Sequence, residues 1–141
     1  MHDITPLKTR SVLYVEDEAI VLMSVVRFLR RRFGTVYEAE NGKVGLALYE
    51  LHRPDLVITD IEMPVMGGME MINRIFELDH HQPIIITTGY KDEAHVSDKV
   101  CWNVIKPLDE EKLLDAIMLC LLKEPGERPM GGISGGLSDG G

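Results

Sequence analysis

One carboxylate stands at the end of an apolar segment, where a reactive group would be accessible. Asp60 follows Leu56–Thr59, four residues typical of a β-strand, and the residues after it cannot extend that strand. Pro64 has no backbone N–H to donate, and Gly67 with Gly68 lets the chain turn closely. Asp60 is therefore predicted at the carboxyl end of a strand, where ligands bind in open α/β sheets. An aspartate that only caps a turn would give the same local pattern.

Three other predicted strands end in groups that suit the same chemistry. Glu16 and Asp17 follow one apolar run, Thr88 closes another, and Lys106 follows a third. Because the carboxyl ends of parallel strands meet at one edge of a sheet, we expect these groups to lie beside Asp60. Carboxylates about 4–5 Å apart repel each other by roughly 3–4 kcal/mol per pair at an effective dielectric near 20. A hard divalent cation such as Mg²⁺ (or Mn²⁺), together with the lysine, would balance that charge.

Helix capping is the alternative explanation for the acidic run Glu16-Asp17-Glu18. It accounts for one or two acids before a helix, but not for Asp60 or Lys106. A carboxylate beside a divalent cation and an ammonium group can accept a phosphoryl group, because the positive charges neutralise the phosphoryl oxygens during attack. The acyl phosphate so formed is labile, which suits a transient signal.

These side chains need a scaffold in which strands and helices alternate, and the apolar periodicity predicts one. Strands are predicted at 12–15, 35–39, 56–59, 84–88 and 102–105, and helices at 19–33, 43–51, 69–78 and 108–122. A weakly periodic stretch, 91–100, is predicted as a further helix. The helix at 43–51 is expected to direct Val44, Leu48 and Leu51 inward. The predicted fold is α/β, a doubly wound five-stranded parallel sheet between two layers of helices.

Length and composition fit one domain with an extension at each end. The chain has 141 residues, 45% of them hydrophobic, and a net charge of -8 that argues against general nucleic-acid binding. Residues 1–10 are predicted as an N-terminal extension, 11–123 as the domain, and the Gly/Pro-rich 124–141 as a flexible tail or linker. No segment resembles a signal peptide or a membrane span. Cys101 and Cys120 show no paired or metal-type spacing, so we expect buried free thiols in a reducing, cytoplasmic compartment.

Taken together, these motifs resemble the receiver domain of two-component response regulators, over residues 10–123. The resemblance rests on Val15-Glu16-Asp17-Glu18, on Asp60 through Met63-Pro64 to Gly68, on Thr87-Thr88-Gly89 and on Lys106-Pro107. It implies a flavodoxin-like fold, and it implies that Asp60 takes phosphate from a histidine kinase or a histidine phosphotransfer protein.

The resemblance also implies roles for the neighbouring residues. Glu16 and Asp17 would hold Mg²⁺ (or Mn²⁺) directly or through water, with Asp60 and the backbone carbonyl of Glu62 as further ligands. Lys106 and the inward-moving hydroxyl of Thr88 would contact the phosphoryl oxygens, with Gly89 next to them. The Lys106-Pro107 bond is expected to be cis.

Two departures from the family pattern concern the signalling face. The family usually has Tyr or Phe three residues before the lysine, where this chain has Asn103 with Trp102 beside it. Only eighteen positions separate Thr88 from Lys106, about one helical turn fewer than usual. The run Thr88-Gly89-Tyr90 looks like a receiver variant with a remodelled fourth helix. Glu62 and Tyr90 flank the site and are expected to tune the access of water.

We therefore expect a phosphoacceptor switch rather than a turnover enzyme, although it could remove its own phosphate. It would act on a downstream protein as a monomer or weak homodimer, without binding nucleic acid or membrane. It could also be a module cut from a longer regulator or hybrid kinase. One alternative is a Mg²⁺-dependent phosphatase of the haloacid dehalogenase type, which places its nucleophile after the first strand. Another is a receiver-shaped binding module that is never phosphorylated.

Overall fold

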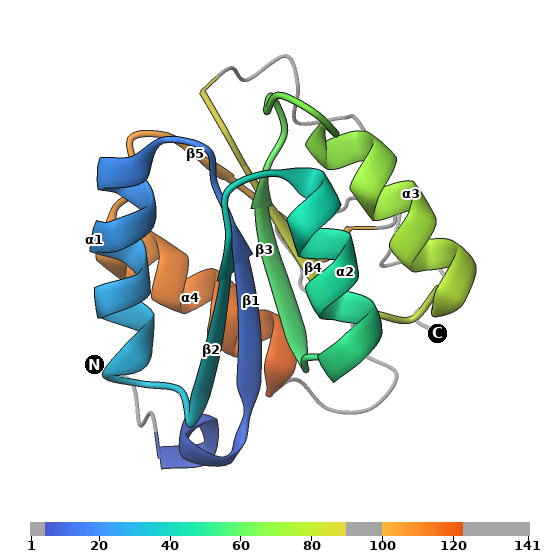
Figure 1. The fold of residues 1–141 in the computed structure, drawn as a ribbon. Coiled ribbons are helices and arrows are strands. Elements are labelled where there is room, and N and C mark those ends of the chain that lie inside the picture. The colour runs from blue at the N-terminus through green and yellow to red at the C-terminus, as the bar shows by residue number, and fades with distance from the viewer. Residues whose placement is uncertain (1–4, 90–99, 123–141) are drawn as a thin grey trace, which may run out of the picture.

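The parallel sheet that the sequence predicts is present in the computed structural model, which describes residues 5–89 and 100–122 (Figure 1). All neighbouring strands run parallel, in the order β2-β1-β3-β4-β5. The tail at 124–141, Tyr90 and all of the predicted helix at 91–100 except Val100 lie outside the described residues. The elements in chain order are η1 (Thr5–Thr9), β1 (Ser11–Val15), α1 (Ala19–Arg30), β2 (Thr35–Ala39), α2 (Gly42–His52), β3 (Leu56–Asp60), α3 (Gly68–Leu78), β4 (Ile84–Thr88), β5 (Trp102–Ile105) and α4 (Glu110–Leu121).

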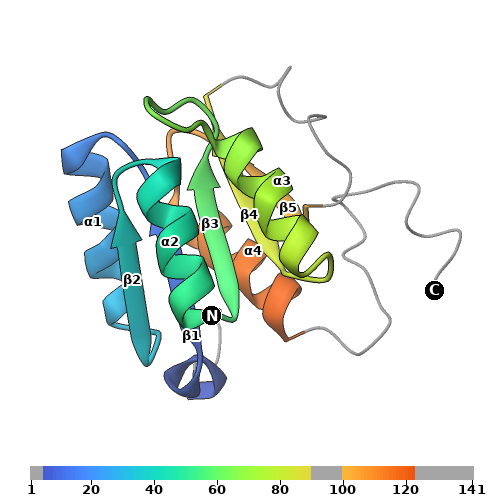
Figure 2. The same ribbon diagram turned by 45° about the vertical axis from the view of Figure 1, so that its right-hand side comes forward.

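The sheet is the middle layer of three. Helices α1 and α4 cover one face, and α2 and α3 cover the other, as the two views in Figures 1 and 2 show. Every residue of β3 and β4 is buried, as continuous apolar strands between two helical layers require. The doubly wound fold is confirmed. None of the helices in the described ranges is long and apolar enough to cross a bilayer.

Two helix ends differ from their predicted positions by more than one residue, for local reasons. Helix α1 ends at Arg30 rather than at Phe33, because the N–H groups of Arg32 and Phe33 both turn back to the carbonyl of Leu29. Helix α4 begins two residues later than predicted. The Asp109 carboxylate caps it by accepting hydrogen bonds from the first backbone N–H groups, at 2.7 and 3.4 Å.

The predicted inner face of α2 is wrong for two of its three residues. Val44 is 40% exposed and Leu51 is 73% exposed, while Leu48 is partly buried. The helix instead turns Gly45 and Tyr49 inward. At Gly45 a Cβ atom would lie 2.8 Å from a methionine sulfur in α3. A glycine that allows such close packing carries no apolar signal, so the periodicity indicated the wrong face.

The expectation of free thiols is also wrong. Cys101, immediately before β5, and Cys120 in α4 form a disulfide. They are 19 positions apart in the sequence, and the packing of α4 against β5 brings their Cα atoms to 6.0 Å. The feasibility of a disulfide depends on this tertiary distance, which sequence spacing does not report.

The amino ends of the strands are fastened by several contacts outside the strand ladders. Leu7 of η1 is fully buried, and its carbonyl accepts a hydrogen bond from the N–H of Gly34, just before β2. The Asp55 carboxylate, before β3, accepts from both the N–H and the hydroxyl of Ser11 in β1, at 2.8 and 3.3 Å. The side-chain amide of Gln82, before β4, donates to the carbonyl of Asp55. At the start of β5 the attachment is covalent, because the disulfide joins Cys101 to α4.

Candidate functional site

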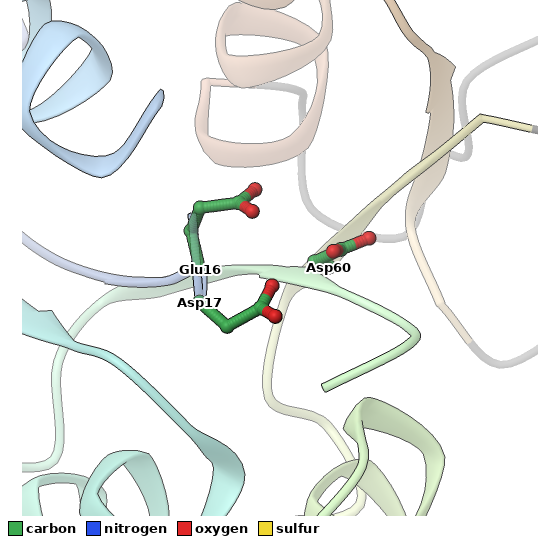
Figure 3. A group of neighbouring side chains, drawn as sticks. All are labelled: Glu16, Asp17 and Asp60. Atoms are coloured by element: carbon green, nitrogen blue, oxygen red, sulfur yellow. The ribbon is translucent and has the colours of Figure 1, made fainter. Parts of the chain in front are cut away.

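Three carboxylates meet at the carboxyl edge of the sheet (Figure 3). Glu16 and Asp17 follow β1, and Asp60 is the last residue of β3, the strand next to it. One oxygen from each lies within 4.8 Å of the others. Glu16 and Asp60 are buried, whereas Asp17 is exposed. The structure thus brings together the acidic residues that the sequence singled out.

Lys106 lies against two of these carboxylates. Its ammonium nitrogen is 3.2 Å from Glu16 Oε1 and 3.4 Å from Asp60 Oδ2. Burial alone would lower the pKa of Lys106, but the charges of Asp60 and Glu16 outweigh it and raise the pKa above its usual value. The lysine is therefore protonated at neutral pH. Its peptide bond to Pro107 is cis, as expected.

The oxygens of Glu16 are largely engaged. Oε1 accepts a hydrogen bond from the Tyr14 hydroxyl at 3.3 Å as well as from Lys106, and Oε2 accepts from the N–H of Glu18 at 3.2 Å. Sequence reasoning missed Tyr14. The available signal was its hydroxyl two residues before Glu16, because side chains at i and i+2 of a strand lie on one face. Burial raises the pKa of Tyr14, and the nearby charge of Glu16 raises it further.

Helix capping does not explain the acidic run. Glu18 occupies the cap position of α1, but its side chain makes no capping hydrogen bond. The Glu16 carboxylate bonds the N–H of Glu18 instead, within the turn that leads into the helix. The acids after β1 are therefore directed to the edge of the sheet rather than to the end of α1.

The charge of Asp60 is only partly balanced by the protein. Its Oδ1 accepts the N–H of Ile61 at 2.8 Å, and its Oδ2 faces Lys106. Even so, burial raises the pKa of Asp60, and the charge of Asp17 adds to the rise. Burial raises the pKa of Glu16 as well. One lysine does not compensate three carboxylates, so an all-oxygen donor set with excess negative charge remains, which fits Mg²⁺ or Mn²⁺.

An open hollow of 320 Å³ lies over these groups, room for about ten water molecules at ~30 Å³ each. Its lining combines the acidic residues with the predicted phosphoryl contacts: Asp17, Glu18, Asp60, Glu62, Thr88, Gly89 and Lys106. Thr88 is buried at the end of β4, and its carbonyl accepts the backbone N–H of Lys106 at 2.7 Å. The hollow therefore offers both anionic and cationic groups to one small ligand.

The loop after Asp60 is held in a specific shape. The N–H of Gly68 donates to the carbonyl of Ile61 at 2.7 Å, and a Cβ atom on Gly68 would lie 2.1 Å from the carbonyl oxygen of Asp60. Val65 has a φ of 72°, which is unfavourable for a β-branched residue. The N–H of Gly42 donates to the carbonyl of Met66 and ties this loop to α2.

The accessory residues Trp102, Asn103 and Pro107 do not line the hollow. Asn103 is partly buried opposite Ile86, and neither amide atom has a hydrogen-bond partner among residues 5–89 and 100–122. Trp102 packs against the core on the α1 and α4 side. Pro107 lines a neighbouring groove beside α1, which shares Glu18 and Lys106 with the hollow.

Comparison with known protein families agrees with this geometry. A sequence model described as "Response regulator receiver domain" matches residues 12–118. An uncharacterized response regulatory protein of Staphylococcus epidermidis is 36% identical over 124 residues, which cover 81% of this chain and 49% of that protein. The transcriptional regulatory protein HptR of Staphylococcus aureus is 34% identical over 109 residues, covering 72% and 42%. The chain spans about half the length of these relatives.

Solved structures give the same result. A response regulator receiver domain protein from Clostridium thermocellum has a TM-score of 0.74 at 27% identity, covering 80% of this chain and 94% of that one. CheY of Borrelia burgdorferi, solved with CheX, BeF₃ and Mg²⁺, has a TM-score of 0.72 at 27% identity, covering 77% and 87%. The regulator TrrA of Thermotoga maritima, solved with Mg²⁺ and BeF, has a TM-score of 0.71 at 28% identity, covering 77% and 96%.

Proposed function

The chain belongs to the response regulator receiver family, and on that premise we propose that it is a phosphorylation switch in which Asp60 accepts the phosphoryl group. The observation that carries the proposal is the cluster of Glu16, Asp17 and Asp60 within 4.8 Å, with the Lys106 ammonium against it. Folding alone would not favour so much like charge, but a phosphoryl-transfer site requires it.

The metal would be held mainly by the two aspartates. Asp17 is exposed to the hollow and Asp60 lies beneath it, whereas the oxygens of Glu16 already accept three hydrogen bonds. We therefore assign Glu16 a contact through water, and the backbone carbonyl of Glu62 the remaining protein contact. When bound, Mg²⁺ or Mn²⁺ would neutralise the phosphoryl oxygens during transfer.

In the transfer step, an oxygen of Asp60 attacks the phosphorus of a phosphohistidine. The P–N bond breaks as the P–O bond forms, and the imidazole nitrogen keeps the electron pair and takes up a proton. Lys106, protonated and fixed by Glu16, would hold one phosphoryl oxygen, and the Thr88 hydroxyl would bind another. Hydrolysis of the acyl phosphate would return the switch to its resting state, so no separate substrate is turned over.

The partners follow from the same proposal. The phosphodonor would be a histidine kinase or a histidine phosphotransfer protein. The receiver would lie in the cytoplasm and act there on a downstream protein. Because the curated relatives are about twice as long and include a transcriptional regulator, we propose that this receiver controls an effector rather than binding nucleic acid itself. A haloacid dehalogenase-type phosphatase is not supported, because Asp60, the aspartate in contact with Lys106, ends β3, whereas that family places its nucleophile after the first strand.

The test is incubation with Mg²⁺ and acetyl phosphate, followed by intact-mass measurement. We expect the mass to increase by one phosphoryl group in the unmodified protein and not in Asp60→Asn. Glu77→Gln removes an exposed carboxylate from α3 and should be phosphorylated normally, which controls for the loss of charge alone. Incorporation that persists in Asp60→Asn would refute the assignment of the acceptor.

A further inference from the structure

We propose that the Cys101–Cys120 disulfide is a reversible modification site, opened by a dithiol reductant, through which thiol redox state reaches the phosphoacceptor site. The proposal that the bond opens and closes reversibly depends only on the disulfide. The coupling part rests on the proposed phosphorylation of Asp60. The site is distinct from the acidic hollow, because Cys101 lies at the amino end of β5 and Lys106 follows the carboxyl end.

The two sulfurs are not equally accessible. Cys120 is 4% exposed within the core between α1, α4 and the sheet, whereas Cys101 is only partly buried at the margin of that core. Cys101 is therefore the more exposed residue of the pair, and the proposal takes its sulfur as the one that a reductant thiolate attacks. Reactivity in thiol–disulfide exchange depends on such access.

The exchange is balanced with a dithiol as the two-electron donor. A thiolate of the reductant attacks Cys101 Sγ and forms a mixed disulfide, and Cys120 leaves as a thiolate that takes up a proton. The second thiol of the reductant then attacks the reductant's own sulfur in the mixed disulfide. Cys101 leaves as a thiolate, which is also protonated. The protein gains two thiols, and the reductant becomes a disulfide.

Strand β5 connects this bond to the site. It is the last strand in the sheet order, and among residues 5–89 and 100–122 its only strand neighbour is β4. The N–H of Cys101 donates to the carbonyl of Ile84 at 2.7 Å, next to the β4–β5 ladder. Lys106 follows that ladder at its other end, roughly 16 Å away at ~3.3 Å per residue. Opening the disulfide removes a covalent attachment from the strand that positions the lysine.

In a reducing cytosol, the state of the Cys101–Cys120 pair would report an oxidising change. Disulfides are rare in reducing cytosol, where those that occur are mostly transient, catalytic or redox-sensing. For a receiver that works on the cytoplasmic side, a closed Cys101–Cys120 pair would mark an oxidising episode and an open pair the resting condition. A partly exposed cysteine immediately before β5 suits that use better than a pair buried entirely in the core would.

The first experiment measures redox behaviour without phosphorylation. The folded protein is equilibrated in buffers of reduced and oxidised glutathione, or with dithiothreitol, and its thiols are trapped with a maleimide reagent for mass measurement. We expect the two thiols to appear and disappear together while the far-UV circular dichroism stays native. A pair that never closes in oxidised glutathione, or that opens only after unfolding, would overturn the redox site.

The second experiment measures coupling. Initial rates of Asp60 phosphorylation by acetyl phosphate are compared for oxidised protein, reduced protein and Cys101→Ser/Cys120→Ser, with Cys101→Ala/Cys120→Ala as a second variant. We expect the initial rates of the oxidised and reduced protein to differ at least threefold. Both variants should be phosphorylated at the rate of the reduced protein, and dithiothreitol should not change their rates. Equal rates would overturn the coupling but not the redox site. Absence of phosphorylation in every form would instead refute the proposed function, and the coupling with it.

Discussion

Among single side chains, Tyr14 has the most specific link to the chemistry. Its hydroxyl is fully buried and donates to the same Glu16 oxygen that Lys106 contacts. Two donors on one oxygen fix the carboxylate, and the carboxylate in turn fixes the ammonium. Tyr14 would thus position the lysine without touching the phosphoryl group.

Tyr14→Phe keeps the ring and removes only the hydroxyl. We expect affinity for Mg²⁺ to fall by about tenfold, the lower range for loss of a partner behind a metal site. The free energy of unfolding should fall by about 1.5–3 kcal/mol, as for a hydrogen bond to a charged group. Mg²⁺ titration and urea unfolding measure the two effects. Unchanged Mg²⁺ affinity would show that the hydroxyl has no positioning role.

The raised pKa values of Asp60 and Glu16 predict how stability depends on pH without metal. A carboxyl whose pKa is higher in the folded state contributes stability below the unfolded-state pKa, and that contribution is lost as pH rises through the folded value. The metal-free protein should therefore become less stable from mildly acidic to neutral pH. Excess Mg²⁺ should restore the loss, because it favours the ionised carboxylates.

Thermal unfolding across this pH range, with Mg²⁺ and with a chelator, tests the prediction. Asp60→Asn removes one of the two carboxyl groups with a raised pKa, so it should flatten the metal-free pH profile. We expect it to raise stability at neutral pH by about 1–3 kcal/mol, since the loss of two repulsions and of a burial cost exceeds the loss of the Lys106 contact. A variant less stable than the original at neutral pH would contradict this balance.

At the scale of elements, the loop between β3 and α3 determines where Asp60 lies. Gly68→Ala would place a Cβ atom 2.1 Å from the carbonyl oxygen of Asp60, so the backbone at Asp60, the proposed acceptor, must move. We expect a loss of about 1–3 kcal/mol in unfolding free energy, with slower phosphorylation. Gly67→Ala is the matched control, because its nearest contact would be an ordinary 3.5 Å and it should cost at most about 1 kcal/mol. Equal effects of the two substitutions would contradict the steric argument.

The elements also show which features could be predicted from sequence. The strands and their acidic ends were predictable, because buried parallel strands appear as apolar runs and their carboxyl ends share one edge. The inner face of α2 was not, because Gly45 packs through the absence of a side chain. The Tyr14 contact could have been predicted from its i, i+2 spacing to Glu16, whereas the Cys101–Cys120 bond depends on a distance between separate elements, which no local pattern reports.

For the whole molecule, the disulfide is also a source of stability. It closes a loop between residues 19 positions apart, which corresponds to about 3 kcal/mol if the bond acts mainly on the unfolded chain. Reduction should therefore lower the free energy of unfolding by about that amount at fixed Mg²⁺, as measured by urea unfolding with and without dithiothreitol. Cys101→Ser/Cys120→Ser should show no response to the reductant. Equal stability of the oxidised and reduced protein would argue against the entropic contribution.

The fastening of the strands at their amino ends has a mechanical consequence. The buried Leu7, the Asp55–Ser11 and Gln82–Asp55 hydrogen bonds and the disulfide all lie at the end of the sheet opposite the acidic hollow. A protein that docks over the hollow can therefore displace the loops there while the strand pairing persists. Amide hydrogens near the amino ends should exchange slowly throughout such binding, and the response should be confined to the half of the domain that carries the chemistry.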